Sequence, residues 1–145
     1  IIPPEVVILG TVRSFLPEVK DLVLKRIKEI ANGVGKSLDC KIEIEIKDLT
    51  PPVVNDPKLA KRVQRVVKEL FPKDTIIDDS KTMGSEDMAF MMEDIPGCYI
   101  FLGSKNDGKR LNFGHHHPKF DIDESSMPKG IALLTATIFD LLPKQ

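Results

Sequence analysis

The three histidines of the chain form a single run, His115, His116 and His117. Histidine is the commonest metal ligand in proteins, and its side chain titrates nearest to neutral pH. In an extended chain His116 would point away from its two neighbours, so at most one face of the run can serve a single site. The spacing alone leaves two interpretations open: a metal-binding or catalytic role, and a solvated or core-capping loop.

Three carboxylates follow the histidines closely, Asp121, Asp123 and Glu124. Zinc normally takes three or four protein ligands, so the histidine run is not by itself a metal site. The carboxylates could complete such a site, or they could hold its ligands through hydrogen bonds. An exposed turn ahead of a helix is the interpretation that we favour for them.

A second polar group consists of Gly84, Ser85, Glu86 and Asp87. If Ser85 caps a helix, the backbone N–H groups at the helix start could bind an anionic substrate. Ordinary helix capping explains the same residues and is favoured. Arg13 lies within a segment of strand character, where a long cation is unusual. It could bind a carboxylate through two hydrogen bonds, or it could lie on a solvated face.

The elements that must position these residues alternate between strand and helix patterns, which predicts an α/β fold. Residues 6–13 are rich in β-branched side chains and residues 41–47 alternate apolar with charged side chains, so both segments are predicted strands. Between them, apolar residues at helical spacing predict a helix that begins at Pro17 and stops at Gly33 or Gly35. This β-α-β unit is typical of half of a small α+β sandwich.

A domain boundary is predicted at Pro51 and Pro52, because adjacent prolines stiffen the chain and exclude helix. Immediately after it, Asp56 is a candidate N-cap and Pro57 a candidate first residue of a helix. The apolar positions that follow recur at helical spacing, and the basic side chains between them are interpreted as a solvated helix face.

The remainder of the chain continues the alternation of strand and helix patterns. Residues 75–77 are a predicted short strand, Ser85 is predicted to cap a second helix, and residues 98–102 have the continuous apolar character of a central strand. A last helix is predicted from Pro128 to Leu142. It is apolar nearly all round, which predicts either deep burial or the loss of a covering partner.

Composition excludes several classes of function. The 145 residues carry a net charge of −1, so there is no general electrostatic attraction to nucleic acid or to an anionic membrane. No stretch approaches the roughly 18 to 20 apolar residues that span a bilayer. Cys40 and Cys98 make no disulfide framework; we expect buried apolar side chains rather than nucleophiles, and free cysteines favour the cytoplasm. The chain begins at Ile1 without an initiator methionine, and we expect a piece of a longer protein.

Four segments of the chain, in this order and at this spacing, resemble a known enzyme family. They resemble the amidohydrolase branch of the aminoacylase and carboxypeptidase G family of zinc peptidases, which includes hippurate hydrolases, N-acyl-amino-acid amidohydrolases, auxin-conjugate hydrolases and thermostable carboxypeptidases. The segment with the histidines is highly specific, the other three are supportive, and the resemblance covers essentially the whole chain. The segments are residues 1–15, 51–56, 83–87 and 116–124.

The resemblance implies a two-domain fold in which an α+β lid, usually also the dimerisation domain, is inserted into an α/β catalytic domain. Residues 1–50 would be the second half of the lid, and residues 51–145 would be the C-terminal part of the catalytic domain. The architecture would therefore be incomplete. The resemblance also implies that His116, two residues before the proline, is a metal ligand. It would place Arg13 and residues 84–87 near the substrate.

The resemblance further implies one or two divalent ions per whole enzyme, zinc or else cobalt or manganese. The metal would act as a Lewis acid and lower the pKa of bound water toward about 7. That water would attack the amide of an N-acyl amino acid or short peptide, and an acidic general base would relay the proton. This chain lacks the N-terminal catalytic segment that carries the base and the other ligands. We therefore expect part of a metal-dependent amidohydrolase, inactive alone, that retains no metal by itself.

A rival hypothesis makes the chain a noncatalytic interaction module left by a truncated or split gene. The alternation of Ile42, Ile44 and Ile46 and the apolar last helix would provide an adhesive surface for dimerisation. A metal-binding segment and a Glu-Glu pair encoded upstream would favour the amidohydrolase, and a monomeric state in solution would count against the interaction module.

Overall fold

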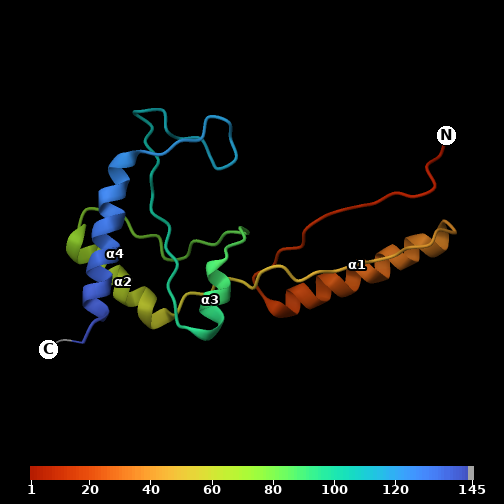
Figure 1. Ribbon diagram of the computed structural model, residues 1–145, viewed down its shortest axis with the longest axis horizontal. Coiled ribbons are helices and arrows are strands. Elements are labelled where there is room, and N and C mark those ends of the chain that lie inside the picture. The colour runs from red at the N-terminus through yellow and green to blue at the C-terminus, as the bar shows by residue number, and fades with distance from the viewer. Residues whose placement is uncertain (144–145) are drawn as a thin grey trace. The chain divides into compact units, whose positions relative to one another are not determined.

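The computed structural model describes residues 1–143, and their regular structure is helical (Figure 1). None of these helices is long and apolar enough to cross a membrane. The helices, in chain order, are α1 (Pro17–Ser37), α2 (Pro57–Leu70), α3 (Met88–Asp94), the short 3₁₀ helix η1 (Glu124–Ser126) and α4 (Met127–Leu141).

The four predicted strands, at residues 6–13, 41–47, 75–77 and 98–102, are absent from the described residues, and this part of the prediction was wrong. One isolated antiparallel bridge joins Asn106 and Leu111. A strand needs a neighbour that satisfies its backbone N–H and C=O groups. No backbone hydrogen bonds join these segments into a ladder within residues 1–143. The described part of the chain therefore does not form the expected α/β architecture.

The Asn55 side chain takes the place of a strand partner for Tyr99. Its Nδ2 donates to the Tyr99 carbonyl at 2.8 Å, and the Tyr99 N–H donates to its Oδ1 at 2.8 Å. The Asp56 N–H donates to the Gly97 carbonyl, also at 2.8 Å. A side chain thus satisfies part of the backbone of the predicted central strand, and the N-cap residue of α2 bonds to the residue just before that strand.

The described chain divides into two compact units. The first comprises Ile1–Pro52 with Lys81–Phe90, and the second comprises Val53–Ser80 with Met91 and the described residues that follow it. In the first unit Arg13 donates to the Met83 carbonyl, and Lys20 pairs with Asp48 at 2.7 Å. These two contacts tie the segments before and after α1 to other parts of the same unit.

Helix α1 begins at Pro17, as predicted, but runs through both glycines to Ser37. The expectation that Gly33 or Gly35 stops it was wrong, because neither glycine has the positive φ of a helix end. Gly35 serves a close approach instead. A Cβ built on it would lie 2.5 Å from Cγ1 of Ile42 and 2.9 Å from the Cys40 carbonyl oxygen. The glycine therefore gives the returning segment room against the helix.

The two glycines of α1 should respond oppositely to alanine. Gly33→Ala places its methyl group in open space, so we expect α1 to gain about 0.5–1 kcal/mol from lower chain entropy and better helix propensity. Gly35→Ala forces Ile42 and the Cys40 backbone to move, and we expect lower stability. Thermal unfolding followed by far-ultraviolet circular dichroism measures both. Equal shifts in the two variants would show that Ile42 does not pack on Gly35.

The second unit is built on α2 and α4, which pack against each other. Helix α2 begins as predicted: the Asp56 carboxylate accepts from Lys58 N at 2.9 Å and Leu59 N at 2.8 Å, and Pro57 is the first helical residue. The Asp140 carboxylate of α4 accepts from Arg62 and, at 2.6 Å, from Arg65. Both guanidinium groups, Arg62 first, lower the pKa of Asp140, so it stays ionised between the two helices.

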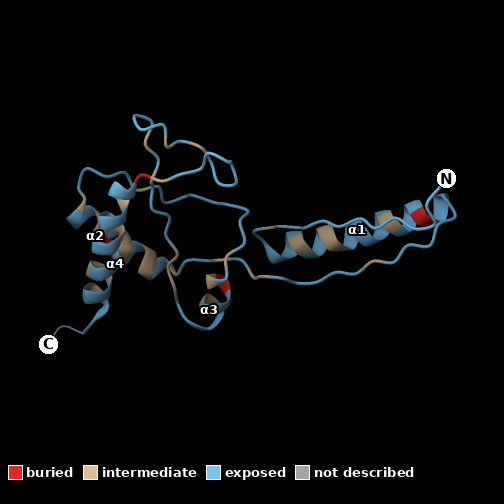
Figure 2. Ribbon diagram, turned by 45° about the horizontal axis from the view of Figure 1, so that its top comes forward, coloured by how far each residue is buried: buried red, intermediate tan, exposed pale blue. Residues whose placement is uncertain are grey.

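Helix α4 spans almost the predicted range, from Pro128 to Leu142, but only one side of it is buried. Leu133 is buried, with 7% of its surface exposed, and the exposed large apolar residues of the helix are Met127, Ile131, Leu134, Ile138, Phe139 and Leu141. Exposed residues also cover much of the other helices (Figure 2). The expectation of deep burial was therefore wrong, because much of the apolar surface of α4 is exposed within residues 1–143.

Candidate functional site

The histidine run lies in the loop between the Asn106–Leu111 bridge and η1. His116 has a φ of 67°, in the left-handed region, where histidine is one of the few side chains found with any frequency. The run is therefore not extended, and the simple alternation of an extended chain does not describe where its rings point.

The rings on either side of His116 are engaged within the loop. The His115 ring meets Phe120 edge to face, with centroids 4.8 Å apart, and the His117 ring stacks on Phe113 at 4.3 Å. His117 Nδ1 also accepts the Lys119 N–H at 3.0 Å. That nitrogen already has a donor and is not available to a metal in this conformation.

His116 differs from both neighbours. Its side chain is exposed and has no hydrogen bond, ion pair or ring contact with any described residue. Both of its ring nitrogens are therefore open to a ligand. A core-capping role does not fit this ring, because it is not packed against the core.

The carboxylates after the histidines separate into two kinds. Asp121 and Glu124 are exposed, as expected of a turn, but the same expectation was wrong for Asp123. Asp123 is 7% exposed, and its carboxylate accepts from Asn106, from Lys109 Nζ at 2.8 Å and from Ser125 N at 3.2 Å. Lys109 and then Asn106 hold the pKa of Asp123 well below its usual range. Neither Asn106 nor Lys109 was singled out from the sequence; the Asn-Asp-Gly turn that holds them was the available signal.

The other two predicted groups are brought together in the first unit. The Arg13 guanidinium donates to the Met83 carbonyl, directly before Gly84. The predicted helix start at Ser85 was wrong, because α3 begins at Met88 and has only seven residues. Ahead of it, the Glu86 carbonyl accepts the Ala89 N–H at 3.1 Å, across three residues. The Asp87 carbonyl accepts the Phe90 N–H in the same way. Glu86 and Asp87 therefore lie in a tight turn before the helix, and residues 84–87 do not form a helix N-terminus that could bind an anion.

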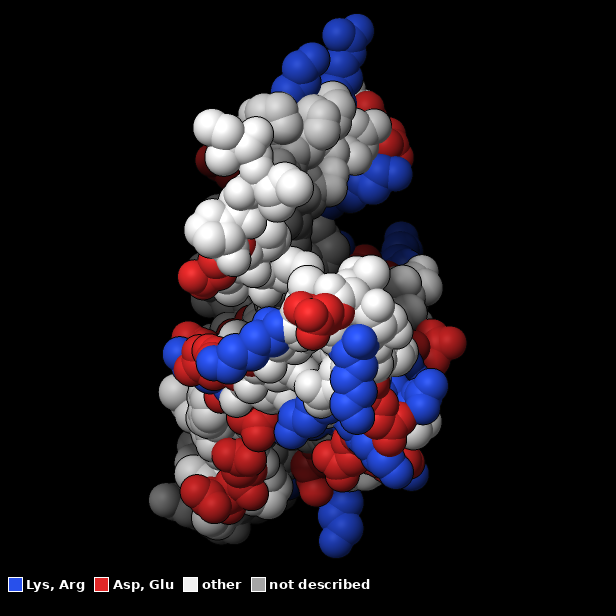
Figure 3. Space-filling view, turned by 90° about the vertical axis from the view of Figure 1, so that its right-hand side faces the viewer, with Lys and Arg blue, Asp and Glu red and all other residues white. Residues whose placement is uncertain are grey.

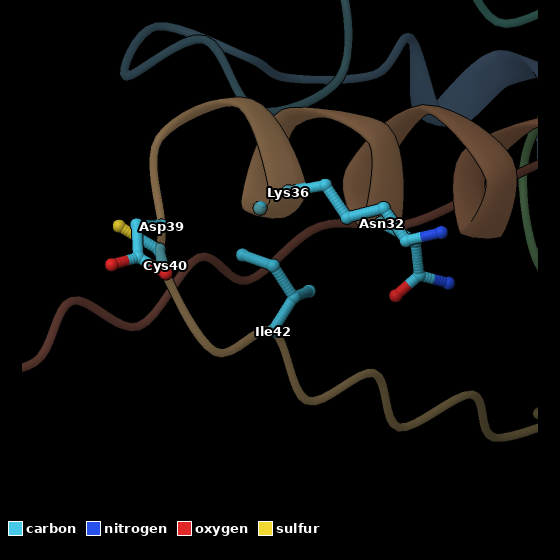
Figure 4. A pocket seen from close by; sticks show the side chains of 6 residues that line it. Asn32, Lys36, Asp39, Cys40 and Ile42 are labelled. Carbon is cyan, nitrogen blue, oxygen red and sulfur yellow. The ribbon is translucent and has the colours of Figure 1, made fainter.

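A shallow hollow of about 410 Å³ lies at the C-terminal end of α1 (Figure 4). It contains none of the predicted site residues; its lining is Asn32, Gly35, Lys36, Asp39, Cys40 and Ile42. Cys40 is exposed, contrary to expectation, and its thiol donates to the Leu38 carbonyl at 3.3 Å. Burial raises the pKa of the half-buried Cys98 thiol, with Asp56 adding to the effect, so the thiolate is disfavoured there.

Acidic and basic side chains lie among one another where charged residues gather in Figure 3. No broad area of one sign stands out on that face, in keeping with the net charge of −1. An interspersed surface of this kind provides no strong steering field for a polyanion.

Comparison of the amino-acid sequence with known proteins assigns the chain to a family. The family model described as "Peptidase family M20/M25/M40" matches residues 3–140. The chain belongs to this family. No solved structure matches it significantly.

Three curated relatives illustrate the M20/M25/M40 similarity. An uncharacterized hydrolase, y4tI, of Sinorhizobium fredii is 32% identical over 100% of this chain and 36% of its own length. The N-acetyl-L-cysteine deacetylase of Bacillus subtilis is 32% identical over 89% of this chain and 29% of its own. Thermostable carboxypeptidase 1 of Saccharolobus solfataricus is 28% identical over 90% of this chain and 33% of its own length. The chain spans about a third of the length of these relatives.

The M20/M25/M40 family is generally metal-dependent, so the described residues can be tested against a divalent ion. His116 fits a ligand position, because its imidazole is exposed and free. However, residues 1–143 contain no group of three His, Cys, Asp or Glu side chains placed to hold a metal. The described chain therefore offers a ligand without closing a site around it.

Proposed function

We propose that this chain is the C-terminal part of a metal-dependent amidohydrolase or carboxypeptidase that hydrolyses N-acyl amino acids or short peptides. The observation that carries the proposal is the free imidazole of His116 in a chain matched over residues 3–140 by the M20/M25/M40 family. Two relatives are named for such reactions, a deacetylase and a carboxypeptidase. The relatives are about three times as long, which leaves room for the remaining ligands and the general base.

In this proposal the chain's own residues have limited tasks. His116 supplies a nitrogen ligand to zinc, cobalt or manganese, one or two ions per enzyme. The metal, when bound, polarises the amide carbonyl and lowers the pKa of a water molecule. Arg13 and residues 84–87 contact the substrate near the lid, and residues 1–50 pair two lids in a homodimer. The adjacency of Arg13 to Gly84, through the Met83 carbonyl, supports a common role for these two groups.

The apolar surface of the chain favours a second candidate, a noncatalytic dimerisation module. Ile42, Ile46 and much of α4 are exposed, and such patches mark association surfaces. The same observation fits the amidohydrolase, in which the absent segment covers part of this surface.

We place the protein in the cytoplasm, because neither cysteine is paired within residues 1–143.

The two candidates differ in an activity assay. We expect a protein with the upstream catalytic segment restored to release amino acids from N-acetyl amino acids or dipeptides when zinc, cobalt or manganese is supplied, and to lose this activity to a chelator. The 145-residue chain alone should give no turnover above the buffer with any of these ions. Turnover by the chain alone would contradict its incompleteness, and inactivity of the longer protein with all three ions would favour the dimerisation module.

A further inference from the structure

We infer that Asp123 is a positioning residue for His116, whose carboxylate clamps both ends of the loop that presents this imidazole. The inference rests on the proposed function, because it assigns His116 the role of metal ligand. Asp123 itself is not assigned as a ligand. Its carboxylate is almost fully buried, and both of its oxygens accept hydrogen bonds from the protein.

The clamp begins with the side chains that lie ahead of the histidine loop. Asn106 Nδ2 donates to Asp123 Oδ2, and Lys109 Nζ lies 2.8 Å from Oδ1. The backbone adds a third connection, since the Asp123 N–H donates to the Ser104 carbonyl at 2.9 Å. Residues 104–109 are thus held by a single residue that stands on the far side of the histidines in sequence.

The same residue fixes the chain beyond the loop. Asp123 Oδ1 accepts the Ser125 N–H at 3.2 Å, and its carbonyl accepts the Ser126 hydroxyl at 2.8 Å and N–H at 3.0 Å. These bonds start η1, and α4 continues directly from it. The loop of residues 110–122 therefore leaves from and returns to one anchored point, Asp123 at the start of η1.

Fixing both ends matters because the contacts inside the loop join only residues that are close in sequence. The ring contacts are those of His115 with Phe120 and of His117 with Phe113, and the Lys119 ammonium lies 5.7 Å from the centre of the Phe113 ring. The hydrogen bonds run from His117 N–H to the Gly114 carbonyl, from Phe120 N–H to the His117 carbonyl and from Lys119 N–H to His117 Nδ1. Each ring contact is weak by itself. A left-handed residue such as His116 persists only where its surroundings hold it. The buried carboxylate provides the stronger, charge-assisted bonds that do so.

The test uses the protein with its upstream segment restored and measures zinc binding by equilibrium dialysis. Asp123→Asn keeps the size of the side chain but removes its charge, and we expect the zinc Kd to rise about 10-fold or more, as for other residues that orient metal ligands. Asp121→Asn is the matched control. Asp121 is exposed and accepts only from the adjacent Ile122 N–H among the described residues, so its zinc Kd should stay within about twofold of the unmodified protein.

A second readout needs no metal. In the zinc-free protein, trypsin should cleave after Lys119 faster in Asp123→Asn than in Asp121→Asn, because the loop ends are released. Both readouts are taken at a temperature at which circular dichroism shows the variants equally folded, so that a general loss of stability does not imitate the effect. If Asp123→Asn does not fold, Lys109→Gln replaces it. Lys109 is an exposed cation bonded to the same carboxylate, and its loss should shift both readouts in the same direction by a smaller factor.

The outcomes separate this inference from the proposed function. If His116→Ala binds zinc like the unmodified protein, the proposed role of His116 fails, and the positioning role fails with it. If His116→Ala loses zinc while Asp123→Asn keeps normal affinity and normal cleavage after Lys119, the proposed function stands and the positioning role is overturned. Weakened zinc binding with faster cleavage after Lys119 supports both.

Discussion

Replacing His116 with alanine in the protein with its upstream segment restored is expected to lower kcat/KM for an N-acetyl amino acid by roughly 1,000-fold or more. A catalytic metal lowers the activation barrier by several kcal/mol, and each 1.4 kcal/mol is a factor of ten in rate. The loss should be accompanied by a loss of bound zinc, measured as metal per protein after dialysis.

His115→Ala is the matched control for this experiment. It removes an identical side chain from the adjacent position, but the His115 ring meets Phe120 rather than standing free. We expect its zinc content to be unchanged and its activity to fall by no more than a few-fold. If His115→Ala proved as damaging as His116→Ala, the assignment of the free ring as the ligand would be wrong.

Leu133→Ala is expected to give the largest loss of stability in the isolated chain. Leu133 is one of very few large apolar side chains that the described residues bury, and it lies on α4, which packs on α2. Removing a buried leucine side chain to the β-carbon costs about 2–5 kcal/mol. In a chain with so little buried apolar surface, this loss should separate α4 from α2. Chemical denaturation followed by circular dichroism measures the free energy of unfolding.

The neighbouring Leu134 provides the control, because it is 59% exposed on the same helix. Leu134→Ala should change the stability of the isolated chain by no more than about 0.5 kcal/mol. An equal effect of the two substitutions would mean that α4 packs through a different face. In the protein with its upstream segment restored, a larger cost at Leu134 would indicate that the absent segment covers this face.

Helix starts could be predicted from the sequence because their causes are local. Asp56 accepts from two N–H groups of the first turn of α2, and Pro57 has no N–H that needs a partner. Such signals act between residues a few positions apart, so they survive whatever the rest of the chain does. Ser85 resembled the same signal, but the prediction that it caps a helix was wrong. The Glu86 and Asp87 carbonyls accept from N–H groups three residues later, as in a turn, and α3 begins only at Met88.

Strands could not be predicted in the same way, because a strand depends on residues distant in sequence. Residues 41–47 have the alternation of a strand, yet no described segment makes the backbone hydrogen bonds of a ladder with them. Gly35 illustrates a related difficulty. A glycine that ends a helix usually has a positive φ, and Gly35 does not. It leaves space for Ile42 instead, and no local sequence pattern reveals that role.

At the candidate site, the amino-acid sequence by itself determined that all three imidazoles lie in one run and that family-like residues surround them. Only the tertiary structure decided that two of the rings are occupied by Phe113 and Phe120 while His116 stays free, and that Asp123 is buried. The reason is physical. Residue type sets which bonds a side chain is able to make. The two side chains that bond to the Asp123 carboxylate, Lys109 and Asn106, lie 14 and 17 residues earlier in the chain, and only folding brings them within hydrogen-bonding distance.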